Sequence, residues 1–405
     1  MSQSWTVDEV KYVNENQGKK SCAAMGEKLG RSKDSVQKKI RAMRKKSGKM
    51  PDDTIAKVNE KLIRENKKLA NKLSDALDME HVFVDSFKKA LSDADPIPTA
   101  PTVRFYKSKT QKDKHTCNMG IEFSDLQMGM FIKPEDTIFL GGYNFEIFKE
   151  RLDKFRDVII TIAEENRRVR QIDDLIIFGL GDYVEGEQIF PSQGLFIDKC
   201  VADQFVEGVN AISTFLRDLS AHFKNVRLYG VWGNHGRLGR FAHGHQRSNM
   251  DYLLLKTLQM RCEPVKNLKI HVSTGPVMAV QIFDRIHLLR HGDDTCGWMG
   301  IPFYGMERDT LKYANLLRAT ISDAHVGHHH RQASWEVSAM KIHMNGSFCG
   351  PTPFGIHKLK AADLPSQSVF ILHPEHGMTW RAPIWLEKPM PLKMDDTNGI
   401  FTPYS

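Results

Sequence analysis

The sequence predicts an α/β protein, a layered mixed β-sheet sandwich flanked by helices, which follows a small all-α domain and a long helix. Three observations lead to this fold class. From about residue 118, apolar runs of strand length alternate with amphipathic helical stripes, an order typical of a partly parallel sheet covered by helices. After residue 265, the apolar residues form hairpin-like pairs of short strands. The first 50 residues instead repeat apolar positions at helical spacing.

Residues 1–50 are expected to form three short helices. Thr6 and Glu9 make a capping-box pattern at the start of the first helix. The second helix is expected to end before Gly30, a residue type favoured just past a helix C-terminus. Ser32 then caps a third, basic helix. Three short helices that end in a basic one suit a helix-turn-helix module, whose last helix enters the DNA major groove.

The charge of the chain is concentrated in this module. Residues 31–49 hold nine basic residues and one acid, so this stretch accounts for the whole net charge of +8. Such a patch favours a polyanionic partner, with nucleic acid first among the candidates. The residues expected to contact DNA are Lys33, Gln37, Lys38, Arg41, Arg44 and Lys45. The stretch SCAAMGEKLGRSKDSVQKKIRAM resembles Myb/SANT-like and phage-type helix-turn-helix domains; the alternative is a basic helical bundle that binds no nucleic acid.

Residues 54–92 are expected to form one long helix. Its apolar positions step by three or four, with Asn66 as a polar position in the seam, which is typical of a coiled coil that would pair two copies as a homodimer. The alternative is a helix packed on the neighbouring domain. Residues 93–115 contain closely spaced prolines, which exclude helix and predict an extended linker.

Residues 116–392 form the main predicted domain, and residues 393–405 a C-terminal tail. Within the domain, the apolar runs 175–182 and 226–234 have the length of buried strands. Each is preceded by a helix with apolar residues on one stripe, so the segment has the βαβαβ order of a parallel sheet.

The composition narrows the class of protein. Hydrophobic residues make up 41% and charged residues 26%, which is ordinary for a globular protein with a sizeable core. The sequence contains no apolar run of about eighteen residues, so no membrane partner is expected. Its start, MSQSWTVDEV, does not have the pattern of a secretory signal. The six cysteines are widely spread without a CxxC pair, which favours a reducing, cytoplasmic setting.

Polar donors follow five of the predicted strands. In sheets of this kind, ligands bind beyond the carboxyl ends of the strands. The donors, in chain order, are Asp125 and Gln127, Asp182, Asn234 and His235, His291, and finally His328 and His330. One such strand end is weak evidence, since an isolated aspartate there is commonly a cap or an ion-pair partner. Five in order are not explained by packing, because unpaired buried donors destabilise a fold.

This ordered set of motifs, DLQ, GD, GNH, a single H and GHHH, resembles the calcineurin-like metallophosphoesterase superfamily. The resemblance covers roughly residues 118–390, and the N-terminal module favours the DNA-exonuclease and phage nuclease branch. It implies a metallophosphoesterase-type sandwich and hydrolysis of a phosphodiester by a water activated between two divalent metal ions. A phage-infected bacterial cytoplasm is one setting that fits this branch.

The resemblance also implies a role for each strand-end residue. One metal ion would be held by Asp125, Gln127, Asp182 and His330, and the other by Asp182, Asn234, His291 and His328. His235 would lie beside the ions and stabilise the developing charge or protonate the leaving oxygen. Arg237 and Arg240 would hold flanking phosphates, with ordinary surface charge as the alternative.

Two positions depart from the family pattern. Gln127 stands where histidine is usual, and an amide oxygen favours Mn²⁺ or Mg²⁺ over zinc. The alternative is that Gln127 binds no metal and leaves that site weak. Gly236 stands where an acid is common, which removes an orienting partner for His235. Glu185 and Glu187 follow Asp182 closely and are expected to reach the site through water or to face solvent.

The sequence therefore predicts a two-metal-dependent phosphodiesterase that acts on DNA, a nuclease that uses Mn²⁺ or Mg²⁺. One alternative is a phosphatase or small-nucleotide phosphodiesterase, for which the basic helix is only a tether. Another is a DNA-binding regulator or assembly protein with a vestigial metal site.

Overall fold

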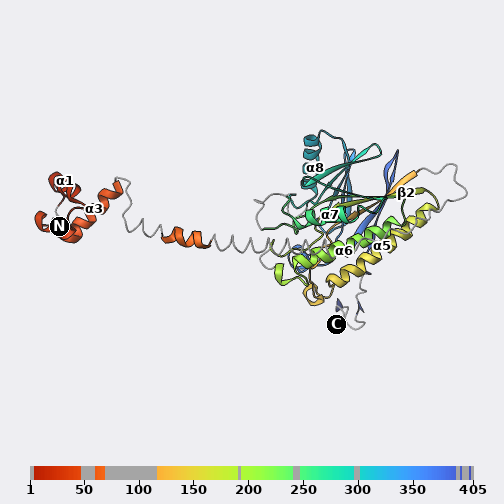
Figure 1. Cartoon of the computed structure of the whole chain (residues 1–405), viewed down its shortest axis with the longest axis horizontal. Coiled ribbons are helices and arrows are strands. Elements are labelled where there is room, and N and C mark those ends of the chain that lie inside the picture. Colours follow the sequence, from red (N-terminus) through yellow and green to blue (C-terminus); the bar gives the residue numbers. More distant parts are fainter. Residues whose placement is uncertain are drawn as a thin grey trace. The chain divides into compact units, whose positions relative to one another are not determined.

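The computed structural model describes residues 4–46, 60–68, 116–189, 193–239, 247–295, 302–388, 393–394 and 401–402. The chain divides into two compact units, Met1–Asp85 and Ser86–Ser405 (Figure 1). Each unit is described by itself below.

The N-terminal unit contains the three predicted helices: α1 (Val7–Asn16), α2 (Cys22–Leu29) and α3 (Lys33–Lys46). The capping box is present, since the Thr6 hydroxyl accepts from the Glu9 N–H and the Glu9 carboxylate accepts from the Thr6 N–H. Gly30 has a φ of 62°, as expected for a residue that ends a helix. The helices meet in a small core made of Val13, Met25, Val36 and Ile40.

Arg31 belongs to the architecture of this unit. Its guanidinium donates to the Glu9 carboxylate at 2.8 Å and lies over the Trp5 ring, 4.4 Å from the ring centroid. One of the nine basic residues counted in the sequence is therefore committed to an ion pair within the fold. The side chains of Lys33, Gln37, Lys38 and Arg41 on α3 are exposed. Arg44 and Lys45 lie in the last turns of α3, and the structure describes only their backbone.

The Glu9–Arg31 pair makes the N-terminal unit sensitive to acid. The hydrogen bond from Arg31 lowers the pKa of Glu9 from 4.5 to about 2. Because the folded pKa is the lower one, the stabilisation is present above pH 4.5 and is lost as the pH falls toward 2. We expect the urea concentration at which this unit is half unfolded to fall as the pH is lowered from 4.5 to 2. For Glu9→Gln, we expect this urea midpoint to be lower at neutral pH and to change less with pH.

The NMR signals of the Val13 and Val36 methyl groups in the full chain report the unfolding of this unit. If the urea midpoints of wild type and Glu9→Gln change with pH in the same way, the assignment of the acid sensitivity to Glu9 is refuted.

Residues 60–68 are helical, within the range predicted for the long helix. Leu62 and Ile63 are 50% and 67% exposed. The remainder of 54–92 and the predicted linker 93–115 lie outside the described residues, so pairing of two copies through this helix stays a prediction.

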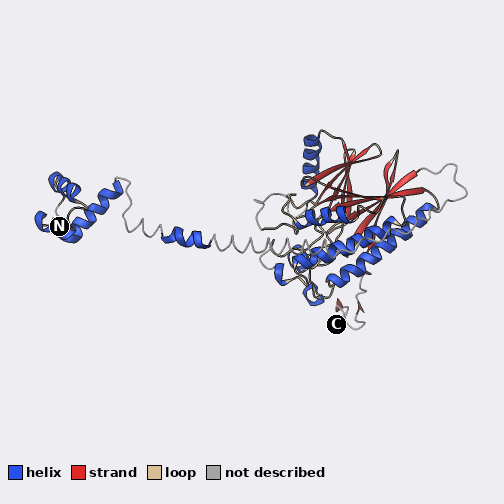
Figure 2. Cartoon of the chain, viewed as in Figure 1, coloured by secondary structure: helices blue, strands red, loops and turns tan. Residues whose placement is uncertain are grey.

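The larger unit contains two mixed sheets, whose strands are drawn in red in Figure 2. The six-stranded sheet has the order β11-β10-β1-β2-β3-β4. Its parallel strands are β1 (Thr116–Phe123), β2 (Gln171–Leu180), β3 (Asn225–Val231) and β4 (Leu268–Val272). The antiparallel strands β10 (Ser366–His373) and β11 (Gly377–Trp385) complete it. The predicted parallel segment is confirmed.

The five-stranded sheet has the order β5-β6-β7-β9-β8. Its strands are β5 (Val277–Ile282), β6 (Arg285–Arg290), β7 (Ile321–Val326), β8 (Ala333–Val337) and β9 (Met340–Met344). The pairs β5–β6 and β8–β9 are the antiparallel hairpins expected after residue 265, while β6, β7 and β9 run parallel. Two short strands, β12 (Lys393–Met394) and β13 (Phe401–Thr402), pair in the predicted tail.

Helices α5 (Phe145–Arg167), α6 (Val201–Ser220) and α7 (Met250–Arg261) contact strands of the six-stranded sheet, α5 against α6 and α6 against α7 (Figure 1). Helix α8 (Phe303–Leu317) packs through Met306 on the five-stranded sheet. Short helical turns are η1 (Pro134–Thr137), η2 (Gln193–Leu195) and η3 (Gly355–Leu359). None of the described helices combines the length and the apolar character that crossing a membrane requires.

One buried hydrophobic core lies between the two sheets. Ile176, Phe178 and Leu180 of β2 share one buried cluster with Val280 of β5 and Leu289 of β6. The two sheets therefore pack face to face, which confirms the predicted layered α/β sandwich. Because β1, β2 and β3 are parallel, the segments that follow them emerge at the same edge of the sheet.

Candidate metal centre

Five strand-end residues share an unusual backbone conformation. Asp125, Gln127, Asp182, His328 and His330 all have positive φ, between 44° and 67°. Non-glycine residues seldom occupy this left-handed region, and such strain concentrates at functional sites. The turns it produces direct side chains from separate strands toward a common region.

Two glycines allow the loops after β2 and β3 to touch. Gly181 has a φ of 91°, and a Cβ atom there would lie 2.4 Å from the backbone nitrogen of Gly233. A Cβ atom on Gly233 would lie 2.0 Å from Oδ1 of Asp182. The glycines of the GD and GN motifs are thus required by close backbone approach.

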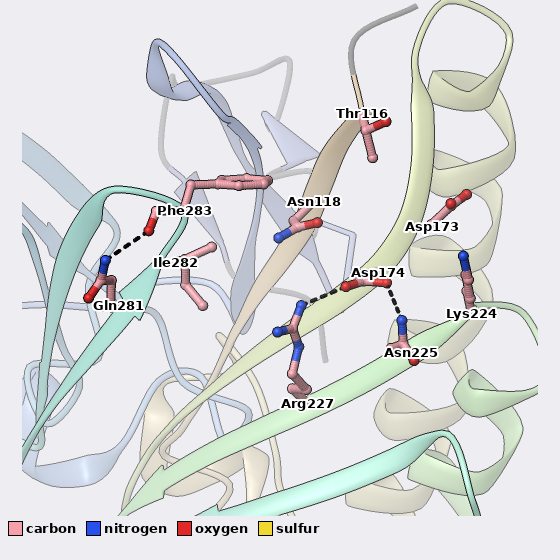
Figure 3. A pocket seen from close by; sticks show the side chains of 10 residues that line it. All are labelled: Thr116, Asn118, Asp173, Asp174, Lys224, Asn225, Arg227, Gln281, Ile282 and Phe283. Carbon is pink, nitrogen blue, oxygen red and sulfur yellow. Dashed lines mark hydrogen bonds and ion pairs between the residues drawn. The ribbon is translucent and has the colours of Figure 1, made fainter.

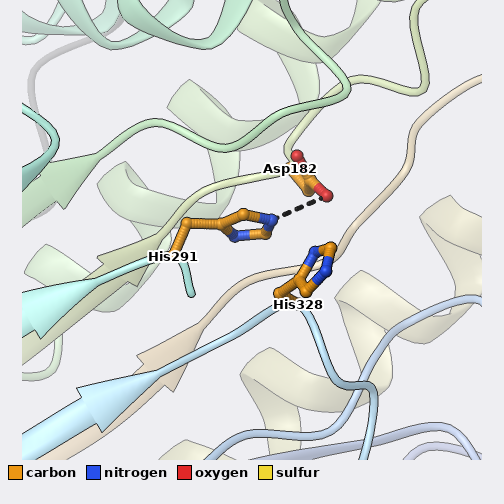
Figure 4. A group of neighbouring side chains, drawn as sticks. All are labelled: Asp182, His291 and His328. Carbon is orange, nitrogen blue, oxygen red and sulfur yellow. Dashed lines mark ion pairs between the residues drawn. The ribbon is translucent and has the colours of Figure 1, made fainter. Parts of the chain in front are cut away.

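Asp182, Asn234 and His291 bring two oxygen atoms and a ring nitrogen together. His291 Nδ1 lies 2.8 Å from the carbonyl oxygen of Leu180, which can only accept, so Nδ1 carries the proton. Nε2 lies 2.9 Å from Asp182 Oδ2, with which it forms an ion pair (Figure 4). It also lies 3.1 Å from Asn234 Oδ1. The two oxygens need a positive charge beside them, which a proton on Nε2 supplies without metal and which a divalent cation would supply in its place.

His328 completes this group. One ligand atom each from Asp182, His291 and His328 lie within 4.8 Å of one another (Figure 4). Burial and the neighbouring His291 lower the pKa of His328 to about 4, so its imidazole is neutral at physiological pH. Neutral imidazole is the form that binds metals.

A second group lies at the end of β1. His330 Nε2 is 3.4 Å from Asp125 Oδ1 and 3.3 Å from the Gln127 side-chain nitrogen. The thiol of Cys349 donates to Gln127 Oε1 at 2.9 Å. Turning the amide by 180° exchanges its oxygen and nitrogen, which would place the oxygen beside His330. The backbone N–H of His328 donates to Asp125 Oδ1 at 2.9 Å and so links the two groups.

The charges of the centre are those of ionised acids held by positive neighbours. Burial opposes ionisation of Asp182, but His291 and His235 outweigh it, so the pKa of that carboxyl is lowered. Burial likewise opposes the charge on His291, and the Asp182 carboxylate still raises its pKa to about 9. The Asp182 carboxylate therefore stabilises a positive charge next to it. A divalent cation bound there would supply that charge.

His235 lies beside this group. Its backbone N–H donates to Asp182 Oδ1 at 2.8 Å, and its Nε2 is 3.8 Å from Asp182 Oδ2. On the far side of the ring, Nδ1 is 2.9 Å from Glu185 Oε2. Burial opposes the charged ring, but Glu185 and Asp182 outweigh it and raise the pKa of His235 to about 10.

Glu185 corrects two expectations. The absence of an acid at Gly236 was expected to leave His235 without an orienting partner, and Glu185 was expected to face solvent or act through water. Instead, Glu185 is buried and bonds directly to the ring. Sequence reasoning missed it because Glu185 comes from the loop after β2, whereas His235 follows β3.

Of the two arginines predicted to hold phosphates, the structure describes only Arg237. Arg237 is ion-paired with Asp293, and its side chain is 42% exposed. Arg240 lies outside the described residues.

A separate cavity of about 370 Å³ lies at the opposite ends of the same strands (Figure 3). It is lined by the first residues of β1, β2 and β3, including Asn118, Asp174 and Arg227. Arg227 pairs with Asp174 at 2.6 Å, and Asn225 donates to the same carboxylate at 2.7 Å. None of the predicted metal ligands is among the residues that line this cavity.

The fold and the centre thus define an α/β sandwich with buried carboxylates and imidazoles suited to divalent cations. No family model and no curated protein match the chain. Among solved structures, an archaeal phosphodiesterase aligns over 66% of this chain and 99% of its own, with 13% identity and a TM-score of 0.31. Vacuolar protein sorting 29 from Cryptosporidium parvum covers 66% and 98%, with 14% identity and a TM-score of 0.31. A zinc complex of Vps29 from Entamoeba histolytica covers 53% and 99%, with 15% identity and a TM-score of 0.24. Likenesses of this size carry no argument for function, which rests on the residues of the site.

Proposed function

We propose that the chain is a two-metal-dependent phosphodiesterase that acts on DNA and uses Mn²⁺, with Mg²⁺ as the alternative ion. The observation that carries the proposal is the meeting of Asp182 Oδ2, His291 Nε2 and Asn234 Oδ1 around a position that requires positive charge. The group of Asp125, Gln127 and His330, linked to it through His328, offers donors for a second ion.

The order of the motifs assigns the donors to two cations. One cation would be held by Asp125, Gln127, Asp182 and His330, and the other by Asp182, Asn234, His291 and His328. Such a pair supplies Lewis acidity, gripping a phosphate and activating the attacking water. Two ligand carboxylates against two divalent cations leave a charge of +2, which attracts a phosphodiester.

His235 and Glu185 supply the proton chemistry. The Glu185 carboxylate accepts from Nδ1 and keeps the ring protonated, so Nε2–H is available on the side of Asp182. From that position, His235 donates to a phosphate oxygen or to the leaving oxygen.

DNA as the substrate is supported by the N-terminal unit. Lys33, Lys38 and Arg41 are exposed along α3, on a stretch that carries the net charge of the chain. Clustered lysines and arginines on one helix suit contacts with phosphates. A small phosphate ester as the only substrate, or DNA binding without hydrolysis, are the competing outcomes.

The deciding experiment is a cleavage assay on linear and circular DNA with Mn²⁺, Mg²⁺ or chelator. We expect Mn²⁺-dependent cleavage that chelator abolishes. Hydrolysis of bis(4-nitrophenyl) phosphate without DNA cleavage would indicate a small-ester phosphodiesterase. The absence of both activities, with DNA binding retained, would indicate a DNA-binding protein with a vestigial site.

The basic helix is tested by removing charge from α3. We expect Lys33→Ala, Lys38→Ala and Arg41→Ala together to weaken DNA binding and to flatten its dependence on log salt concentration by about 0.9 for each phosphate that is no longer neutralised. Fluorescence anisotropy in chelator measures this without cleavage. The matched control removes the exposed lysines Lys11, Lys266 and Lys269. Equal affinities and salt slopes for the two triple variants would exclude α3 as the DNA-binding face.

A further inference from the structure

Asp251, in the first turn of α7, joins the loops that carry two of the metal-binding motifs. Its Oδ2 accepts from the backbone N–H groups of Asp182 at 2.7 Å and Gly233 at 2.9 Å. Its Oδ1 accepts from Tyr183 at 3.0 Å and from Val184 at 3.2 Å. A single fully buried carboxylate therefore bonds the loop after β2 to the loop after β3.

Asn249 holds Asp251 in place. As the N-cap of α7, its side-chain oxygen accepts from the Asp251 N–H at 2.8 Å. Its side-chain nitrogen donates to the carbonyl of Gly233 at 2.8 Å. The N–H of Met250 also donates to the carbonyl of Gly236 at 2.6 Å. The start of α7 thus binds the loop after β3 at both of its ends.

The four bonds exclude Asp251 as a metal ligand. Each carboxylate oxygen already accepts two N–H donors, which leaves no oxygen lone pair directed at an ion. Three of the four donors belong to Asp182 and the two residues after it. Asp251 therefore helps to hold the backbone of Asp182 at its φ of 54° in the absence of a metal ion.

We propose that Asp251 is a positioning residue for the metal centre: it fixes the spacing of Asp182 and Asn234 before any ion binds. The inference rests on the proposed function, since it assigns a role within that centre. Its buried charge also adds to the negative potential that a cation meets.

The test compares the Mn²⁺ affinity of full-length wild type and Asp251→Asn. Asparagine keeps the shape but turns an NH₂ group toward two of the backbone N–H donors. Mutation of a residue that positions the metal ligands without binding the metal typically weakens metal affinity by about 10–100-fold, so we expect a loss of that size. Electron paramagnetic resonance measures the concentration of free Mn²⁺, which gives the affinity. The same spectra report the spin coupling between the two bound Mn²⁺ ions. The control is Thr257→Val, which is buried on the same helix and whose hydroxyl has no hydrogen-bond partner among the described residues.

Each outcome decides the inference. Wild-type affinity and coupling in Asp251→Asn would overturn it, as would a lower melting temperature with unchanged Mn²⁺ binding. If Asp251→Asn does not fold, the variant Asn249→Ser is used instead, because serine keeps the helix cap but loses the hydrogen bond to the Gly233 carbonyl. We expect its Mn²⁺ affinity to be several-fold weaker than that of wild type. An unchanged Mn²⁺ affinity overturns the proposal. If the wild-type chain binds no Mn²⁺, the proposed function fails and this inference with it, whereas wild-type binding with an unaffected variant overturns the inference alone.

Discussion

Asp182→Asn is expected to reduce phosphodiester hydrolysis by about 1,000-fold or more, because loss of a shared ligand should exceed the roughly 10–100-fold typical of outer partners. Oδ2 of Asp182 meets His291 Nε2 at 2.9 Å, while Oδ1 accepts from the His235 N–H. Asparagine keeps the shape and one oxygen, so the change removes the charge and leaves the packing. Single-turnover cleavage of linear DNA in Mn²⁺ measures the effect.

The same variant separates metal binding from folding. Without metal, Asp182→Asn loses the ion pair with His291 and the charge that the folded state stabilises, so we expect its melting temperature at neutral pH to be lower than that of wild type. Excess Mn²⁺ should stabilise wild type by mass action and have little effect on the variant. Differential scanning fluorimetry with and without Mn²⁺ measures both.

The control for Asp182→Asn is Asp284→Asn, an exposed aspartate in the turn between β5 and β6. It makes the same chemical change away from the centre and should keep full activity and the full Mn²⁺ shift. Retention of activity by Asp182→Asn would contradict the proposed centre, and so would a wild-type chain that Mn²⁺ does not stabilise.

The sequence was sufficient to predict which residues meet at the centre because the information is local. Asp125 and Asp182 each follow a strand within two residues, and β1 and β2 are parallel neighbours in one sheet, so both residues lie at one edge. His291 and His328 follow strands of the other sheet, and the face-to-face packing of the two sheets brings them to the same place. The capping box of Thr6 and Glu9 was predictable for the same reason, since both partners lie within one helical turn.

The partners of these residues were not predictable, because they depend on loops whose paths the sequence does not specify. Glu185 and Glu187 look equivalent in the sequence, two positions apart. In the structure, Glu185 bonds to the ring of His235, whereas Glu187 accepts from the backbone N–H of Val201 at the start of α6. Asp251 reads as an ordinary acid in the first turn of a helix, and only the fold brings four N–H groups to it.

The charge count near the N-terminus shows the same limit. Arg31 was counted in the basic stretch that favours a polyanionic partner, because composition alone does not reveal an ion pair. Its partner, Glu9, is 22 positions earlier in the chain. Among the basic residues of that stretch whose side chains the structure describes, Lys33, Lys38 and Arg41 are exposed on α3 and are candidates for phosphate contacts.

His235→Gln is expected to lower the rate of DNA cleavage by about 10²–10⁴-fold, the usual contribution of a positioned acid or base. Mn²⁺ affinity should change little, since the bond from the His235 backbone N–H to Asp182 does not depend on the side chain. Glu185→Gln should show a smaller loss that grows at alkaline pH. The reason is that Glu185 raises the pKa of His235, so without it the ring gives up its proton at a lower pH.

The leaving group distinguishes a proton donor from a group that only stabilises charge. The oxygen that leaves in DNA cleavage is a strongly basic alkoxide and needs a proton, whereas 4-nitrophenolate leaves without one. If His235 Nε2–H supplies that proton, His235→Gln should lose far more activity on DNA than on bis(4-nitrophenyl) phosphate, with the rates compared at saturating Mn²⁺. Equal losses on both substrates would show instead that His235 stabilises the charge on the phosphate oxygens, since that charge develops whichever group departs.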